Sequence, residues 1–136
     1  MSNLSAFLNP VSVAEEKEVV ISKRFLDGMG KPAPFKIRSI SQVENESISK
    51  KCSGYRKVKG QQVEYFDNIR YSQELVLAAV VFPDMREAEL CERYGVADPA
   101  LTASAMLLPG EFSSLVQEIM NLSGFEEEDV QAKAKN

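Results

Sequence analysis

The chain has 136 residues and a formal net charge of -4, with 44% hydrophobic and 26% charged residues. These values are typical of one globular domain, and the longest apolar run, Leu75 to Phe82, is far shorter than the roughly 20 residues that cross a bilayer. Because the first residues also lack the basic start and the long apolar stretch of a leader, we expect a cytoplasmic protein with no membrane partner.

The composition argues against catalytic and metal chemistry. The chain contains no histidine, which removes Ser-His, Cys-His and His-metal arrangements. Cys52 and Cys91 are too few and too far apart for a disulfide scaffold or a zinc site, and we expect both to be small buried side chains. We therefore expect no catalytic residue, no metal site and no cofactor.

Charge divides along the chain. Residues 17 to 70 hold twelve of the sixteen Lys and Arg against six acids, whereas residues 71 to 130 hold two basic residues against twelve acids. Such asymmetry allows copies of a protein to associate head to tail, although two solvated surfaces without a partner explain it equally well. The basic residues expected at a self-association surface are Lys36, Arg38, Arg56, Lys57 and Lys59.

Residues 1–16 are predicted to form a flexible N-terminal arm, and residues 18–40 a β-hairpin. The apolar positions that alternate on one face of this hairpin are Val19, Ile21, Phe25, Phe35 and Ile37. Between them, Gly30 suits a turn with positive φ, and Pro32 and Pro34 hold their neighbours extended.

A helix is predicted over 41–51, because Ser41 and Glu44 have the spacing of a capping box. Its expected buried side contains Val43, Ile48 and Cys52. A second hairpin is predicted over 55–66, around a turn at Lys59-Gly60-Gln61.

Helices are predicted for the remaining residues of the domain. Residues 68–82 are apolar on every face toward their end, which favours an enclosed helix ending before Pro83, with a β-strand as the alternative. Shorter helices are predicted over 84–94 and 99–107. The fold class is therefore α+β, with N-terminal antiparallel hairpins and a mostly helical second half in a single domain over 17–125.

The last helix, predicted over 109–123, has the strongest periodicity. Its apolar stripe consists of Phe112, Leu115, Val116, Ile119 and Met120. This stripe either packs on the core or binds a partner helix, and we take it as the candidate partner-binding surface. Residues 126–136 are polar and are expected to be a disordered tail.

The segment from Glu18 to Phe125 resembles a known family. It contains RF-x-DG-x-G-x-PxPFKIR-x-I, then a capped polar helix, an apolar segment ending in FP, and LLPGEF-x-x-L-x-x-x-I-x-x-LSGF. This order resembles the XkdN-like tail-assembly chaperones of tailed phages and prophages that infect Gram-positive bacteria.

The resemblance implies a non-catalytic protein that binds the tape-measure protein and helps recruit tail-tube subunits. It also implies a protein made in the cytoplasm of the bacterial host and absent from the mature virion. Two alternatives stay open. One is a small nucleic-acid-binding module that uses the basic residues between 50 and 59, although the sequence pI near 5 makes nucleic acid an unlikely partner. The other is a structural tail component.

Overall fold

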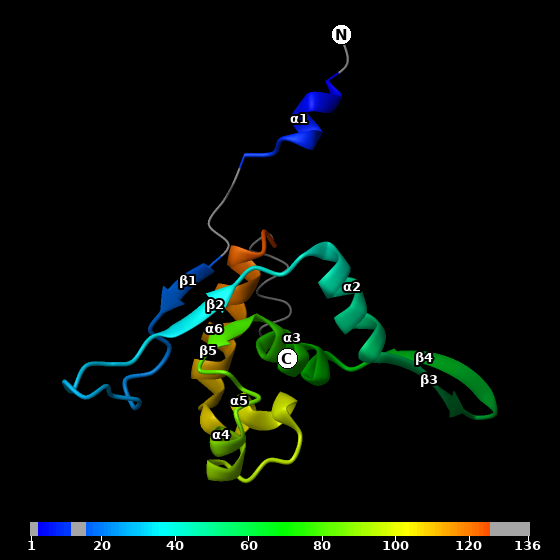
Figure 1. Cartoon of the computed structure of the whole chain (residues 1–136). Helices are drawn as coiled ribbons and strands as arrows, with labels where there is room; N and C mark the ends of the chain where they lie inside the picture. Colours follow the sequence, from blue (N-terminus) through cyan, green and yellow to red (C-terminus); the bar gives the residue numbers. More distant parts are fainter. Residues whose placement is uncertain (1–2, 12–15, 126–136) are drawn as a thin grey trace.

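The computed structural model describes residues 3–11 and 16–125, and its body is built on a three-stranded sheet (Figure 1). The strands are β1 (Glu16–Val19), β2 (Phe35–Arg38) and β5 (Val80–Phe82), in the order β1-β2-β5. Both pairs are antiparallel, with Val19 opposite Phe35. The predicted α+β class with a leading antiparallel strand pair is confirmed.

The core lies between this sheet and two helices, α3 (Asn68–Ala79) and α6 (Pro109–Leu122). Alternation along β2 buries Phe35 and Ile37, while its basic residues are only half-buried. Each helix buries one stripe against the rest of the core. The buried apolar residues of the two helices are Tyr71, Leu75, Val76, Ala79, Leu115, Val116, Ile119 and Met120.

Shorter helical elements complete the body. They are α2 (Gln42–Lys51), α4 (Ala88–Arg93), the 3-10 helix η1 (Pro99–Leu101) and α5 (Thr102–Met106). The capping box predicted for α2 forms: the Ser41 hydroxyl accepts from the Glu44 N–H at 3.1 Å, and the Glu44 carboxylate accepts from the Ser41 N–H at 3.1 Å. The Tyr71 hydroxyl donates to the Asn45 side-chain oxygen and joins α3 to α2.

The connection between β1 and β2 spans residues 20–34 and extends away from the sheet (Figure 1). It continues the antiparallel arrangement irregularly, through an isolated bridge between Leu26 and Pro32. At its tip the Asp27 carboxylate accepts from two backbone N–H groups, and Gly30 takes a φ of 77°. The regular ladder is shorter than predicted, because side chains and turns replace strand pairing beyond Val19.

The second hairpin consists of β3 (Ser53–Val58) and β4 (Gln61–Phe66). It projects from the body between α2 and α3 (Figure 1). Its two-residue turn contains Lys59 at φ 53° and Gly60 at φ 82°, which matches the right-handed twist of the strands. The hairpin therefore forms where it was predicted, as a separate two-stranded sheet.

The prediction of a helix over 68–82 is wrong for the last three of these residues. Helix α3 stops at Ala79, and Val80–Phe82 form strand β5 beside β2. The cause is tertiary: the free edge of β2 supplies hydrogen-bond partners for these residues, and their β-branched and aromatic side chains suit a strand. The β-strand alternative therefore applies to the last three residues of the apolar run.

Two further helices and the exposure of Val43 also differ from the predictions. Helix α4 begins at Ala88 rather than near 84, because the Asp84 carboxylate accepts from the Arg86 N–H and forms a turn. The helix predicted over 99–107 is split into η1 and α5. Val43 was expected to be buried but is 76% exposed, whereas Ile48 and Cys52 are buried as expected.

The arm contains one short helix, α1 (Leu4–Leu8), in its described part, where no firm structure was predicted. Residues 12–15 of the arm and the predicted tail over 126–136 lie outside the described residues.

Candidate functional site

The apolar stripe of α6 lies inside the protein. Four of its residues, Leu115, Val116, Ile119 and Met120, are at most 1% exposed, and Phe112 is partly buried against the same core. A partner cannot reach these side chains on the surface of the folded body. Their packing supports the first of the two interpretations weighed for this helix, in which the stripe holds the core together.

Two of the five basic residues expected at a self-association surface are engaged within the chain. The Lys36 Nζ lies 3.2 Å from Glu16 across the β1-β2 pair. The Arg38 guanidinium donates to both Glu44 carboxylate oxygens, at 3.0 and 2.6 Å. With the Ser41 N–H also donating to it, Glu44 has its pKa lowered to about 2. These contacts connect β2 to its neighbours within the chain.

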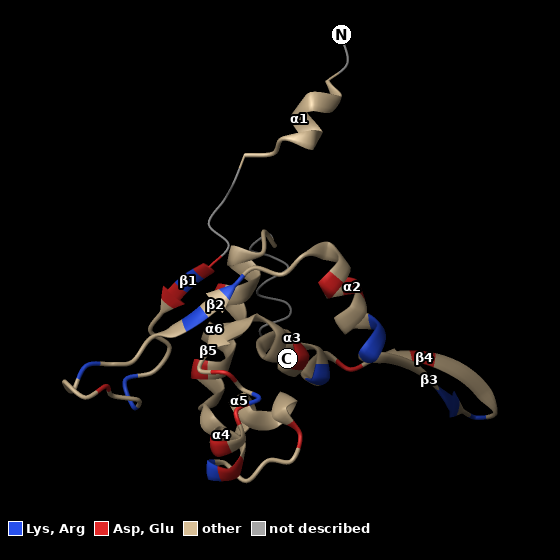
Figure 2. Ribbon diagram, in the orientation of Figure 1, with Lys and Arg blue, Asp and Glu red and all other residues tan. Residues whose placement is uncertain are grey.

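The other three basic residues, Arg56, Lys57 and Lys59, lie together on the β3-β4 hairpin. They are exposed and form the basic part of this projection, at a distance from Lys36 and Arg38 on the sheet (Figure 2). The five predicted residues therefore lie in two separate places, two of them on the three-stranded sheet and three on the β3-β4 hairpin.

The apolar side chains of the hairpin are also in solvent. The face that carries Arg56 also carries Val58, Val63 and Tyr65, because alternate residues share a face. The opposite face carries Tyr55, which is 67% exposed. Both faces of this small sheet thus combine apolar or aromatic groups with positive charge.

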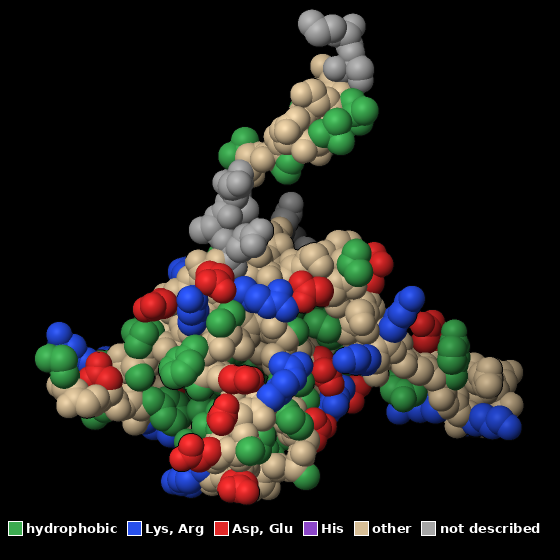
Figure 3. All heavy atoms as spheres, in the orientation of Figure 1, with side chains coloured by type: hydrophobic (Ala, Val, Ile, Leu, Met, Phe, Trp, Pro, Cys, Tyr) green, Lys and Arg blue, Asp and Glu red, His purple; other side chains and the backbone are tan. Residues whose placement is uncertain are grey.

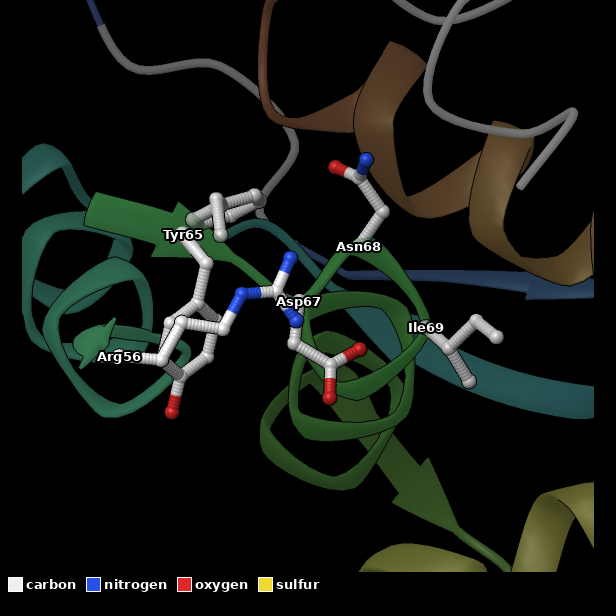
Figure 4. Close-up of a pocket in the computed structure, with 6 residues that line it drawn as sticks. Arg56, Tyr65, Asp67, Asn68 and Ile69 are labelled. Atoms are coloured by element: carbon white, nitrogen blue, oxygen red, sulfur yellow. The ribbon is translucent and has the colours of Figure 1, made fainter. Parts of the chain in front are cut away.

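An open pocket lies where the hairpin joins α3 (Figure 4). The Arg56 guanidinium carbon lies over the Tyr65 ring, 5.4 Å from its centroid, which is within the range of a cation–π contact. Asp67 and Asn68 line the α3 side of the pocket, and Ile69 points away from Arg56 (Figure 4). The Asp67 carboxylate accepts from the Arg70 N–H at 3.0 Å and caps α3. The printed contacts of these polar groups are therefore local: Asp67 caps α3, and Arg56 packs on Tyr65 within the hairpin.

A second open groove, of about 850 Å³, lies beside the end of β5 and α4. Phe82, Pro83 and Leu90 contribute its apolar lining, and the Phe82 side chain is 65% exposed. Its charged lining consists of Asp84, Glu87, Glu89, Glu92 and Arg93. Acidic side chains gather over this lower part of the body in the space-filling view (Figure 3). We call this groove, with the apolar and charged lining just described, the Phe82 groove.

The relationship of this chain to known proteins rests on nearly its whole length. A family model described as phage XkdN-like tail assembly chaperone protein matches residues 4–135. The chain belongs to this family. The phage-like element PBSX protein XkdN of Bacillus subtilis (strain 168) is 32% identical over 139 residues, covering 98% of this chain and 94% of that protein.

A further relative and a solved structure agree with this family membership. The uncharacterized protein YqbN of Bacillus subtilis (strain 168) is 32% identical, over 98% of this chain and 93% of its own length. A crystal structure of the protein YqbN has a TM-score of 0.74 and 27% identity, covering 93% of this chain and 99% of that one. The XkdN-like resemblance drawn from the turn and core residues is confirmed, and with it the general role in phage tail assembly.

The two cysteines of this family member are free, with Cys52 buried and Cys91 half-buried. Among residues 3–11 and 16–125, no group of three or more Cys, Asp or Glu side chains is arranged to hold a metal ion. Burial raises the pKa of the Cys52 thiol, which disfavours its reactive thiolate. No helix in the same ranges is long and apolar enough to span a membrane.

Sequence reasoning missed the Phe82 groove in this tail assembly chaperone. Phe82 was assigned to the end of an enclosed helix, and Leu90 to a separate one. The chain reversal at residues 83–87 brings them together. A local sequence pattern could have indicated the groove. The apolar run ends in Phe-Pro-Asp, and closely spaced glutamates follow it, which predicts an apolar surface with acidic neighbours.

Proposed function

We propose that this protein is a non-catalytic chaperone that binds the tape-measure protein and helps recruit tail-tube subunits during phage tail assembly. It acts in the cytoplasm of the bacterial host and leaves before the virion is complete. The family match over residues 4–135 supports the general role. Binding to the tape-measure protein is supported by the large apolar side chains that the protein exposes.

The observation that carries the proposal is the exposure of large apolar side chains on a projecting loop. In the connection 20–34, Leu26 is 59% exposed and Met29 is 82% exposed. Methionine is flexible and polarizable, so it adapts to varied apolar surfaces. An elongated helical client offers many such surfaces in succession, and a weak repeated contact suits a protein that must later be removed.

Co-expression with the tape-measure protein encoded near this gene tests the proposal. We expect the chaperone to increase the soluble fraction of the tape-measure protein and to co-purify with it. Replacing Leu26 and Met29 with Ser should reduce both effects. The matched control is Val43→Ser, which removes an apolar side chain of α2 that is 76% exposed and should leave both effects unchanged. A tape-measure protein that stays insoluble and never co-purifies would contradict the proposal.

Two other functions predict different results. If the protein were a structural component of the tail, mass spectrometry would detect it in purified particles, whereas we expect it to be absent from them. A nucleic-acid-binding module is favoured by one observation, the exposure of Tyr55 on the same hairpin face as Lys57. That function requires RNA or DNA binding that weakens steeply with salt.

A further inference from the structure

The outer edge of β4 directs backbone hydrogen-bonding groups away from its partner strand. Within the described residues β4 pairs with β3 alone, so it has a neighbouring strand on one side only. Residues of an antiparallel pair alternate between bonded and non-bonded positions. The Asp67 N–H donates to the Cys52 carbonyl oxygen at 2.8 Å, which sets this alternation along the hairpin. The odd-numbered residues of β4 therefore bond to β3, and Gln62 and Glu64 direct their backbone N–H and C=O groups to the other side.

This edge lacks the devices that usually protect an edge strand from pairing. Such strands are commonly very short, bulged, or interrupted by proline or by charged side chains. Strand β4 has six residues, all exposed, and pairs with β3 without a bulge. It contains no proline, and Glu64 is its only charged residue. A two-stranded hairpin is also marginally stable in water unless a third strand or a helix covers it. The edge is thus long and regular enough to receive a further strand.

Apolar side chains lie beside this edge. Val63 and Tyr65 are exposed on the same face of the hairpin. An open pocket of about 480 Å³ lies at the end of β4, where the exposed side chain of Ile69 contributes to its lining (Figure 4). A strand added to β4 lies about 4.8 Å away, so every second side chain of that strand would lie next to these groups. This spacing favours a ligand with apolar residues at alternate positions.

The charge of the hairpin favours acids at other positions of the ligand. Arg56 is exposed on one face, Lys57 on the opposite face, and Lys59 at the turn. Residues 53–66 contain a single acid, Glu64. Acidic side chains of an added strand would therefore meet cations on either face.

We propose that the outer edge of β4 binds an extended segment of a partner protein, in which apolar and acidic residues alternate, as a third strand. The backbone groups of Gln62 and Glu64 supply the pairing, and the side chains beside the edge select the sequence. The hairpin and the connection 20–34 project from opposite sides of the body (Figure 1). The protein can therefore hold this segment and a helical client of the connection at the same time. This binding goes beyond the tape-measure contact and does not depend on it.

Selection from a display library of random twelve-residue peptides, with the full chain as bait, tests the ligand chemistry. We expect enriched peptides in which apolar residues alternate with Asp or Glu. In the presence of an enriched peptide, the amides of Gln62 and Glu64 should exchange with solvent more slowly, because they donate to the added strand. Recovery of peptides without this alternation, or unchanged exchange at these two amides, would overturn the proposal.

A pair of substitutions at one position tests the pairing itself. Gln62→Pro removes the N–H that points away from β3, and proline is tolerated at such an edge position. Peptide affinity, measured by fluorescence anisotropy, should fall about tenfold, the effect of one lost hydrogen bond. Gln62→Thr keeps the N–H and should bind about as well as the wild type. Circular dichroism and the exchange of the Val63 amide establish that the hairpin persists in both variants.

Three further outcomes would count against this site. Equal peptide affinities of the two Gln62 variants would show that no strand is added at this edge. A change in the sedimentation of the protein alone by Gln62→Pro would assign the edge to a contact between copies. Single-stranded RNA that competes with the peptide and binds more tightly would assign the hairpin to nucleic acid. All measurements use the chaperone without the tape-measure protein, so their failure is distinguishable from a failure of tape-measure binding.

Discussion

The Arg24 guanidinium donates to both carboxylate oxygens of Glu111, at 3.2 and 2.5 Å, and also to the Met106 carbonyl oxygen at 3.0 Å. Glu111 lies in the first turn of α6, where its carboxylate also accepts from the Leu108 N–H at 2.8 Å. One side chain of the β1-β2 connection thus holds the start of the helix that supplies much of the core. The favourable position of an acid near a helix N-terminus adds to this contact.

We predict that the Arg24–Glu111 contact makes stability depend on acid pH. Hydrogen bonds from Arg24, Ser22 and the Leu108 N–H lower the pKa of Glu111 to about 2, against an ordinary value of 4.5. Because the folded pKa is depressed, the stabilisation is fully present above pH 4.5 and is lost as the pH falls toward 2. Glu111→Gln should therefore lower the urea midpoint at pH 7, and its difference from wild type should shrink at pH 3.

The control for this prediction is Glu118→Gln. Glu118 forms an exposed ion pair with Lys17 at 3.0 Å, and contacts of this kind contribute little to stability. Its urea midpoint should stay close to that of the wild type at both pH values. Equal effects of the two substitutions at pH 7 would show that the Arg24 contact is no stronger than a surface pair.

Ser41→Ala tests the capping box of α2. The substitution removes the hydroxyl that accepts from the Glu44 N–H, and we expect it to lower the free energy of unfolding by about 1 kcal/mol. Ser47→Ala is the matched control, because Ser47 is exposed inside the same helix, where Ala is the better helix former. Urea unfolding should show a loss for the first variant and no loss for the second.

Features fixed by neighbouring residues could be predicted from the sequence. The cap at Ser41, the turn at Lys59 and Gly60, and the positive φ of 77° at Gly30 depend on the local chain alone. The end of α3 could not be predicted in this way. Whether Val80 continues a helix or begins a strand depends on the open edge of β2, which is distant in sequence.

The candidate surfaces show the same limit. Periodicity identifies Leu115 and Ile119 as members of one stripe, but it does not say whether the stripe faces the core or a partner. The folded structure shows that both side chains are fully buried, so the stripe faces the core. Charge counting correctly separated a basic and an acidic half, yet it could not show that Arg38 is engaged by Glu44 while Lys59 is exposed.

Ile119→Val tests the assignment of the α6 stripe to the core. Removing one methylene from a side chain with no exposed surface should lower the free energy of unfolding by about 1 kcal/mol. Ser114→Ala on the exposed side of α6 is the control and should have little effect. If Ile119→Val left stability unchanged but weakened co-purification with the tape-measure protein, the stripe would be a partner surface after all.

The turn of the second hairpin gives a pair of substitutions with opposite expected effects. Lys59 has a φ of 53°, a conformation that Asn adopts more readily than Lys, so Lys59→Asn should stabilise the hairpin. Gly60 has a φ of 82°, and Gly60→Ala should destabilise the hairpin by about 1 kcal/mol because a Cβ disfavours this conformation. Amide hydrogen exchange of β3 and β4 measures both effects: protection should rise in the first variant and fall in the second, while the amides of α6 stay unchanged. Parallel changes in α6 would mean that the hairpin unfolds only together with the body, in which case it is held more firmly at its base than its exposed faces indicate.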